Sequence, residues 1–86
     1  MHEVRIGRSA KKELKSLPGT IIERVATKID SLAEQARPAG CKKLRGADTL
    51  WRVRVGDYRI VYAVDDDAAV VEIRVIRHRK DAYGSS

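Results

Sequence analysis

Apolar and polar residues follow two different periods along the chain, and each period predicts one kind of element. Residues 2–7 alternate with a period of two, which is typical of a short strand. Apolar residues then recur with helical spacing over residues 10–17 and again over residues 20–35. Pro18 and Gly19 separate these two stretches, so the chain is expected to begin with a strand followed by a helical hairpin.

The second half of the chain returns to a period of two and predicts a sheet. Three strands are expected, over residues 50–55, 58–64 and 69–76. Gly56-Asp57 is a two-residue hairpin turn, residues 65–68 form a second turn, and a basic connector covers residues 42–46. The predicted order is βααβββ, an α+β fold in which an N-terminal helical hairpin packs on a small, antiparallel-rich sheet. A single domain is expected to span residues 1–86.

The two-residue turn sets the register of the first hairpin. Val55 then faces Tyr58 and Arg54 faces Arg59, and side chains alternate between the two faces from there. The apolar face, which the helices are expected to cover, carries Trp51, Val53, Val55, Tyr58, Ile60 and Tyr62. The opposite face carries Arg52, Arg54, Arg59 and Val61.

The second turn extends this polar face by one strand. With residues 65–68 as the loop, Arg74 faces Arg59, and a shift by one residue would turn Arg74 into the core. The prediction is a row of three arginines across neighbouring strands, Arg54–Arg59–Arg74. Like charges that face each other destabilise a sheet, so we interpret the row as a phosphate-binding surface. The alternative is a plain solvated face.

The length and composition of the chain limit the classes of function that it can have. A chain of 86 residues, 43% of them apolar, suffices for one modest core, so no cofactor is expected. The net charge of +6 favours a polyanionic partner such as nucleic acid, or an acidic protein. The single cysteine, Cys41, fits a reducing cytoplasm. No apolar stretch has the length of a membrane span or the form of a signal peptide, and no metal-binding constellation stands in the sequence.

The last predicted strand leads into a basic run and then a tyrosine. Residues 77–80 read Arg-His-Arg-Lys, and Tyr83 follows. Within this run, His78 is the residue whose side chain can gain or lose a proton near neutral pH. The alternative is that His78 is a surface histidine without a catalytic role. Tyr83 either stacks on a nucleobase or packs on the protein.

Three strings, in this order, resemble the RelE/ParE toxin superfamily: KLRG at 43–46, WRVRVGDYRIVY at 51–62 and HRKDAY at 78–83. The resemblance implies a small α/β toxin with an antiparallel sheet, encoded beside an antitoxin. RelE-like members cut mRNA in the ribosomal A site, whereas ParE-like members poison DNA gyrase and do not cut RNA. We adopt the first interpretation, a metal-independent endoribonuclease. A gyrase inhibitor and an inactive, antitoxin-binding member are the alternatives.

The resemblance also implies roles for individual residues. Catalysis would fall to Arg59, to Arg77 or Arg79, and to Tyr83. The residues expected to contact RNA are Lys43, Arg45, Arg52, Arg54, Arg74, His78 and Lys80. No metal ligand is expected among them.

One departure from the family pattern affects the chemistry. The best-known pattern has lysines on the second strand, where this chain has Arg52 and Arg54. Arginine is a poor general base, because it holds its proton throughout the usual pH range. Proton abstraction would then fall to Tyr83, His78 or the ribosome.

The expected partners follow from the charge and the resemblance. They are mRNA on the ribosome and a cognate acidic, RelB-like antitoxin, part of which folds on binding. Toxin and antitoxin would form a hetero-oligomer in the cytoplasm, with no contact to a membrane.

Overall fold

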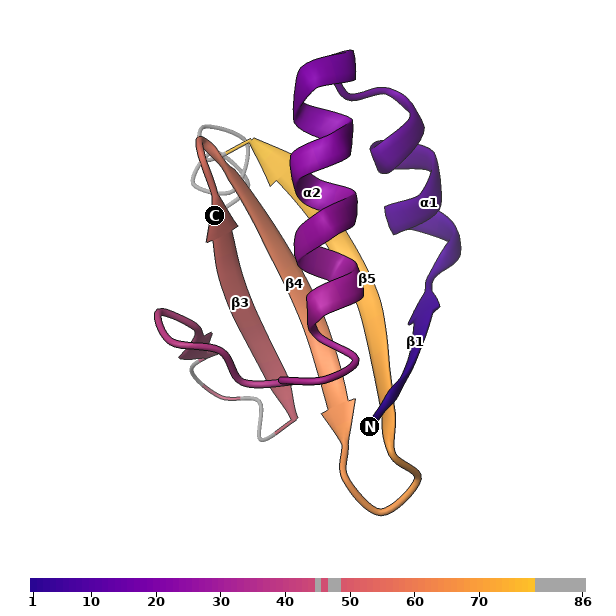
Figure 1. Cartoon of the computed structure of the whole chain (residues 1–86), viewed down its shortest axis with the longest axis vertical. Helices are drawn as coiled ribbons and strands as arrows, with labels where there is room; N and C mark the ends of the chain where they lie inside the picture. The colour runs from indigo at the N-terminus through magenta and orange to yellow at the C-terminus, as the bar shows by residue number, and fades with distance from the viewer. Residues whose placement is uncertain (45, 47–48, 79–86) are drawn as a thin grey trace.

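Two helices pack against a five-stranded sheet (Figure 1). In this computed structural model, residues 1–44, 46 and 49–78 are described. The helices are α1 (Arg8–Lys15) and α2 (Gly19–Ser31). The strands are β1 (Glu3–Ile6), β2 (Lys42–Lys43), β3 (Leu50–Val55), β4 (Tyr58–Asp65) and β5 (Val70–His78). The predicted α+β class and the order of the helices and the four longer strands are confirmed.

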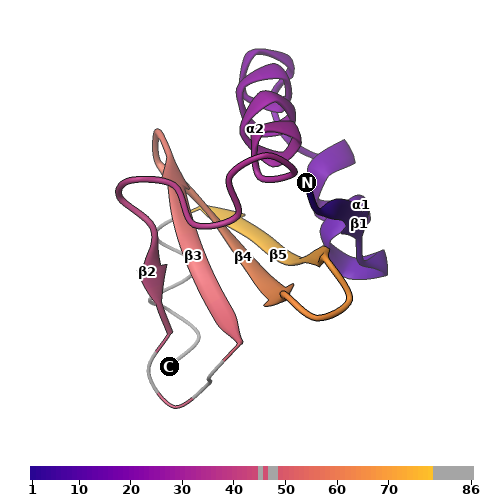
Figure 2. The ribbon, with the colours of Figure 1, turned by 60° about the horizontal axis from the view of Figure 1, so that its bottom comes forward.

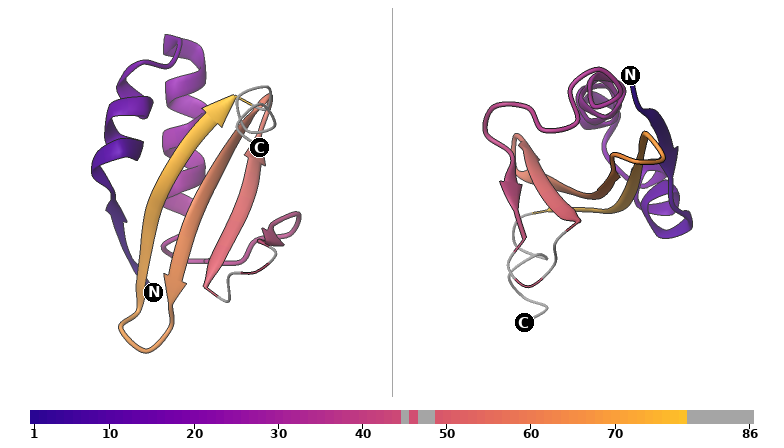
Figure 3. Two further views of the ribbon diagram at one scale, coloured as in Figure 1. Left: turned by 180° about the vertical axis from the view of Figure 1, so that it is seen from behind. Right: turned by 90° about the horizontal axis from the view of Figure 1, so that it is seen from below.

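The strands lie in the order β1-β5-β4-β3-β2. β1 runs parallel to β5, and all other neighbours are antiparallel. β2, which lies beside β3 in Figure 2, was predicted as part of a connector. Two residues are too few to show a period, so the hydrophobic pattern could not reveal this strand. α2 lies over one face of the sheet and α1 lies along the β5 edge (Figure 3). The arginines were predicted on the face opposite α2.

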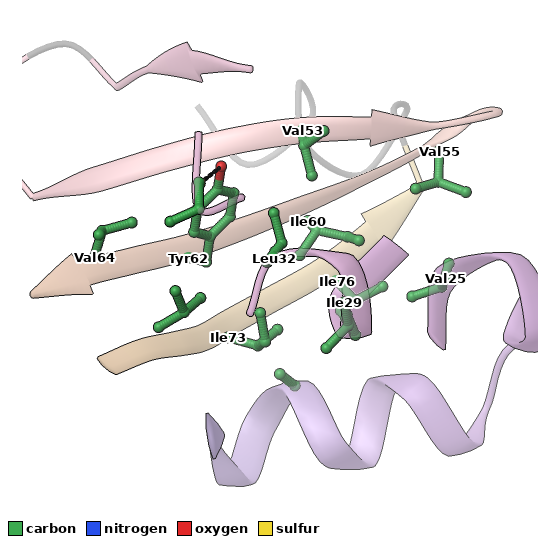
Figure 4. Close-up of a cluster of buried hydrophobic side chains, with 13 residues drawn as sticks. Val25, Ile29, Leu32, Val53, Val55, Ile60, Tyr62, Val64, Ile73 and Ile76 are labelled. Atoms are coloured by element: carbon green, nitrogen blue, oxygen red, sulfur yellow. Dashed lines mark hydrogen bonds between the residues drawn. The ribbon is translucent and has the colours of Figure 1, made fainter. Parts of the chain in front are cut away.

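The core fills the space between the helices and the sheet (Figure 4). The largest fully buried side chains are Tyr62, Leu32, Ile60, Ile73, Ile76, Val25 and Val71. The hydroxyl of Tyr62 donates a 2.8 Å hydrogen bond to the carbonyl oxygen of Ala36, and burial raises the pKa of this hydroxyl above its ordinary value. The predicted apolar face is confirmed, with Trp51 and Tyr58 half-buried at its ends and its other members buried.

The register predicted for the first hairpin is confirmed. Val55 pairs with Tyr58, and Arg54 pairs with Arg59. Gly56 has a φ of 58°, and it is the only one of the two turn residues with a positive φ, as in a type II′ turn. The tight turn brings the two arginines directly opposite each other.

The register predicted for the second hairpin is wrong. Arg59 pairs with Arg77 and not with Arg74. One reason is the turn, which covers residues 66–69 instead of the predicted 65–68. Asp65 therefore pairs with Val70, and Val64 pairs with Val71 instead of Ala69. Ala69 has a φ of 55° there, and the Asp65 carboxylate accepts a 3.0 Å hydrogen bond from the backbone N–H of Ala68.

The other reason is a bulge in β5. Val61 pairs with Val75 and Tyr62 pairs with Ile73, so Arg74 is an extra residue without a partner in the ladder. The bulge keeps Arg74 exposed while Ile73 and Ile76 both stay in the core. The row of arginines therefore reads Arg54–Arg59–Arg77.

Candidate functional site

Basic side chains gather on the open face of the sheet near the β3–β4 turn. Across the strands, Lys42 pairs with Arg52, Arg54 pairs with Arg59, and Arg59 pairs with Arg77. Residues directly opposite each other in a ladder point to the same face, and so do residues two apart in one strand. We call these five residues the basic face: Lys42, Arg52, Arg54, Arg59 and Arg77.

Arg59 stands at the centre of the basic face and is its most enclosed member. It is only 9% exposed, whereas Arg54 opposite is exposed. Arg59, Arg54, Arg52 and Lys42 line one hollow of about 280 Å³. An arginine keeps its charge when buried, and electrostatic interactions are stronger where water is excluded. The hollow is therefore suited to an anion.

Arg77 is tied to helix α1. The Nε of Arg77 donates a 3.0 Å hydrogen bond to Oε2 of Glu13, and the backbone N–H of Ile76 donates a 3.1 Å bond to Oε1 of the same carboxylate. The pairing of β1 with β5 ends at Ile6 and Ile73, so Glu13 occupies the edge of β5 where β1 has stopped. The guanidinium retains two amino groups for a ligand. Glu13 was not among the predicted site residues, although it is the one acid of a basic helix.

Three residues expected to bind RNA lie away from the basic face. Lys43 pairs with Trp51 and therefore shares the helix-side face. His78 pairs with Tyr58 on that same face, and their rings meet edge to face at 5.2 Å. Arg74 forms an ion pair with Glu72 and borders a separate hollow near the β4–β5 turn.

The other predicted site residues lie outside the described part of the chain. They are Arg45, Arg79, Lys80 and Tyr83. The choice between Arg77 and Arg79 thus stays open, although Arg77 is the one shown opposite Arg59. Within residues 1–44, 46 and 49–78, no three His, Cys, Asp or Glu side chains come together as metal ligands would. Among these residues, no helix is long and apolar enough to cross a membrane.

Comparison with known proteins identifies the family. The model of the ParE toxin of the type II toxin–antitoxin system parDE matches residues 4–83. The chain belongs to the RelE/ParE toxin superfamily. The RelE1 protein of Methanocaldococcus jannaschii is 34% identical over 83 residues, which cover 93% of this chain and 92% of that protein. The resemblance seen in the sequence is thereby confirmed.

Solved RelE structures share the fold. RelE in the RelE–RelB complex from Pyrococcus horikoshii OT3 is 31% identical, with a TM-score of 0.81 over 91% of this chain and 94% of that one. The toxin–antitoxin complex RelBE2 from Mycobacterium tuberculosis contains a chain that is 28% identical, with a TM-score of 0.78 over 91% of this chain and 98% of that one. The matching family model bears the ParE name and these relatives bear the RelE name, so membership defines a toxin without defining its target.

Proposed function

We propose that this chain is a RelE-type toxin that cuts mRNA on the ribosome, in the cytoplasm and without a metal ion. The observation that carries the proposal is the arginine row, in which Arg54, Arg59 and Arg77 stand opposite one another across three strands. Such a row has an electrostatic cost to folding. Guanidinium groups pair with phosphate oxygens, so an RNA backbone would neutralise the row.

The proposed chemistry is transfer of a phosphate within the RNA. The 2′-oxygen of a ribose bonds to the adjacent phosphorus, the bond from phosphorus to the 5′-oxygen breaks, and the products are a 2′,3′-cyclic phosphate and a 5′-hydroxyl end. Negative charge builds on the phosphate oxygens during this step, and positioned cations stabilise it. Arg59 and Arg77 would take this role, while Lys42, Arg52 and Arg54 would hold the backbone on either side.

Two protons must move in this reaction, and the described basic face offers no proton acceptor. Its five members are cations that hold their protons near neutral pH. The 2′-hydroxyl would lose its proton to Tyr83 or to a group of the ribosome, because His78 lies on the helix-side face. The leaving oxygen would gain a proton. Ribosomal positioning of the mRNA would supply a large part of the rate, since a fixed in-line geometry lowers the barrier.

A RelB-like antitoxin is the proposed partner of the resting toxin. The solved relatives include complexes of RelE with RelB. A chain with a net charge of +6 and a basic face would attract an acidic segment that folds on binding. The resulting hetero-oligomer would cover the arginine row until the antitoxin is removed.

The second candidate is a gyrase inhibitor of the ParE type. The family model that matches residues 4–83 carries the ParE name, and this observation favours it. Such a protein would need its basic face for binding alone and would require no proton acceptor.

Induction of the chain in cells separates the two candidates. We expect protein synthesis to stop within minutes, with fragmented mRNA and continuing DNA synthesis. Arg59→Ala should slow cleavage of ribosome-bound mRNA on the order of 100–1,000-fold, equivalent to about 2.7–4 kcal/mol, by analogy with a lost oxyanion donor. Arg59→Lys, which keeps most of the buried stem, should restore only part of the rate, because an ammonium makes no bidentate contact.

The matched control is Arg5→Ala, which removes an exposed arginine from β1 that is paired with Glu3. It should cleave at the wild-type rate. Intact mRNA together with early DNA damage signalling would select the gyrase inhibitor. A well-folded Arg59→Ala protein with full cleavage activity would remove Arg59 from the site.

A further inference from the structure

The arginine row borders a pair of apolar side chains on the open face of the sheet. Val61 pairs with Val75 across β4 and β5. The pair of Arg59 and Arg77 stands two positions away along the same two strands. Side chains two apart in a strand share a face, so both valines lie on the side of the arginines. Both valines are half-buried, and we call them the valine floor. Figure 3, left, looks onto this face of the sheet.

The valine floor exists because of the bulge in β5. Regular alternation from Ile73 would turn Val75 into the core, and the extra residue Arg74 brings Val75 to the open face instead. Within residues 1–44, 46 and 49–78, neither Val61 nor Val75 is among the buried residues of the core or the partly buried ones that pack against them. Bulges are common beside active sites, where they redirect a side chain. The valine floor is therefore an apolar surface that the core does not use.

The charges at the two ends of the open face limit the path of an RNA backbone. The basic face lies toward the β3–β4 turn. Toward the β4–β5 turn, residues 65–67 are three exposed aspartates. Every arginine that lines the hollow at this end is already in an ion pair with an acid. The pairs are Arg5–Glu3, Arg37–Asp66 and Arg74–Glu72. Phosphates are attracted to one end and repelled at the other, so the backbone crosses the strands along the arginine row, with the valine floor beside it.

A single nucleotide matches the arginine row and the valine floor together. At a rise of about 3.4 Å per residue, the arginine and the valine of one strand are about 7 Å apart, a separation that a ribose bridges between its phosphate and its base. The guanidinium groups pair with phosphate oxygens. The base is flat and uncharged, and its face and the valine methyl groups are both removed from water when they meet. A phosphate bound by Arg59 and Arg77 thus brings its own base over Val61 and Val75.

We infer that the valine floor holds one nucleobase of the mRNA, that of the nucleotide whose phosphate is bound by Arg59 and Arg77. This inference rests on the proposed function and adds a base contact to a site of phosphate contacts. A base that is held by its face is not read at its edge, so the contact tolerates any sequence. Holding the base fixes the ribose relative to the phosphorus, which favours the in-line geometry of the reaction. Val61 and Val75 are positioning residues and take no part in the chemistry.

The test is a double-mutant cycle between the valine floor and a single base of the message. V61T and V75T, singly and together, exchange a methyl group for a hydroxyl and keep the branched shape that a strand favours. V70T is the matched control, because Val70 is a half-buried valine of β5 at the acidic end of the sheet. Ribosomes carry synthetic mRNAs whose A-site codon is intact or lacks one base, at the first, second or third position, while its ribose and phosphate remain. The measurement is kcat/KM for cleavage.

The expected pattern is one that a folding defect does not give. On the intact codon, V61T and V75T should each lower kcat/KM about fourfold, the effect of one buried methyl group, and V70T should match the wild type. At one codon position, removal of the base should slow the wild type and leave V61T/V75T no slower than the wild type on that message, because the contact is already lost. At the other two positions the losses should multiply. A folding defect would slow cleavage of every message by the same factor.

The outcomes separate this inference from the function on which it rests. If the wild type cuts the intact message and the losses multiply at all three positions, the valine floor holds no base and the proposed function stands. If the wild type cuts no message, both ideas fail together. If V61T/V75T cuts as the wild type does and binds a RelB-like antitoxin more weakly, the valine floor belongs to an apolar side chain of a protein partner and the inference is overturned.

Discussion

At the scale of single residues, Glu13 links the helix layer to the candidate site. Its carboxylate accepts one hydrogen bond from the backbone N–H of Ile76 and another from the Nε–H of Arg77. Ile76 is only 2% exposed. A buried backbone donor without a partner is costly, and a guanidinium held at Nε presents its amino groups in a fixed direction. Glu13 is therefore expected to position Arg77, although it touches no substrate itself.

Glu13→Gln tests this positioning. The amide oxygen can still accept from Ile76, but a neutral side chain loses the charge-assisted bond to Arg77. We expect kcat for cleavage of ribosome-bound mRNA to fall roughly tenfold with KM unchanged, and stability to fall by about 1 kcal/mol or less. The control is Glu23→Gln, at an exposed position of α2, which should change neither kcat nor stability. An unchanged kcat for Glu13→Gln would show that Arg77 needs no such support.

At the scale of elements, the two hairpins show what a hydrophobic pattern can and cannot define. The β3–β4 register was predictable because a two-residue turn allows one alignment that keeps the apolar face together. The β4–β5 register was not, because a four-residue turn can shift by one position and a bulge adds a residue in mid-strand. The signal was present in the spacing of Val71, Ile73 and Ile76, which is two and then three. In a regular strand, residues that face the core are always two positions apart, so a spacing of three indicates a bulge.

The segment that follows α2 is fastened by a polar contact at the opposite end of the sheet from the turn at Gly56. Arg37 lies over the Trp51 ring at 5.0 Å, and its Nη2 donates a 2.8 Å hydrogen bond to Oδ2 of Asp66. The Nε2 of His2 lies 3.2 Å from Oδ1 of Asp66. The contact thus connects the α2–β2 segment, the β4–β5 turn and the N-terminal residues. The Arg37 guanidinium, with His2 as a second cause, holds the pKa of Asp66 below its ordinary value.

This lowered pKa makes part of the stability dependent on acid. A carboxylate with a lowered folded-state pKa contributes stability above its unfolded pKa of about 3.9, and that contribution is lost as the pH falls through the folded-state pKa. We expect the Tm of Asp66→Asn to lie slightly below that of the wild type near neutral pH. The two melting curves should converge as the pH falls through the lowered folded-state pKa of Asp66, because the wild-type carboxyl is then protonated. A gap of constant size down to low pH would assign the effect to packing.

At the scale of the whole molecule, the sequence predicted the fold class, the order of the elements along the chain and the family. It predicted only some of the residues that form the candidate site. Arg52, Arg54 and Arg59 follow from one hairpin and stand where predicted. Lys42 and Glu13 were missed, because one lies in a two-residue strand and the other acts across the edge of the sheet. Contacts between residues far apart in the sequence produce no periodic pattern of apolar residues. They depend on where the helices end and how they pack on the sheet.

The net charge leads to a prediction for the whole molecule. A toxin with a charge of +6 and a basic face should attract an acidic antitoxin over a distance. The association rate constant, measured by stopped flow with a RelB-like antitoxin, should fall at least about tenfold as salt rises from 20 to 500 mM, where charges are screened within about 4 Å. The dissociation rate should change much less. An association rate that is insensitive to salt would contradict electrostatic attraction.

The position of β5 in the sheet has a consequence for how the protein folds during its synthesis. β5 is the last described strand along the chain, yet it lies between β1 and β4. Glu3 pairs with Val70, and β1 has no other neighbour in the described sheet. During synthesis at roughly 5–20 residues per second, the first strand stays unpaired and the arginine row lacks its third member. Under the proposed function, a nascent chain therefore cannot yet cut the message that encodes it, because the complete arginine row forms only after β5 has been made.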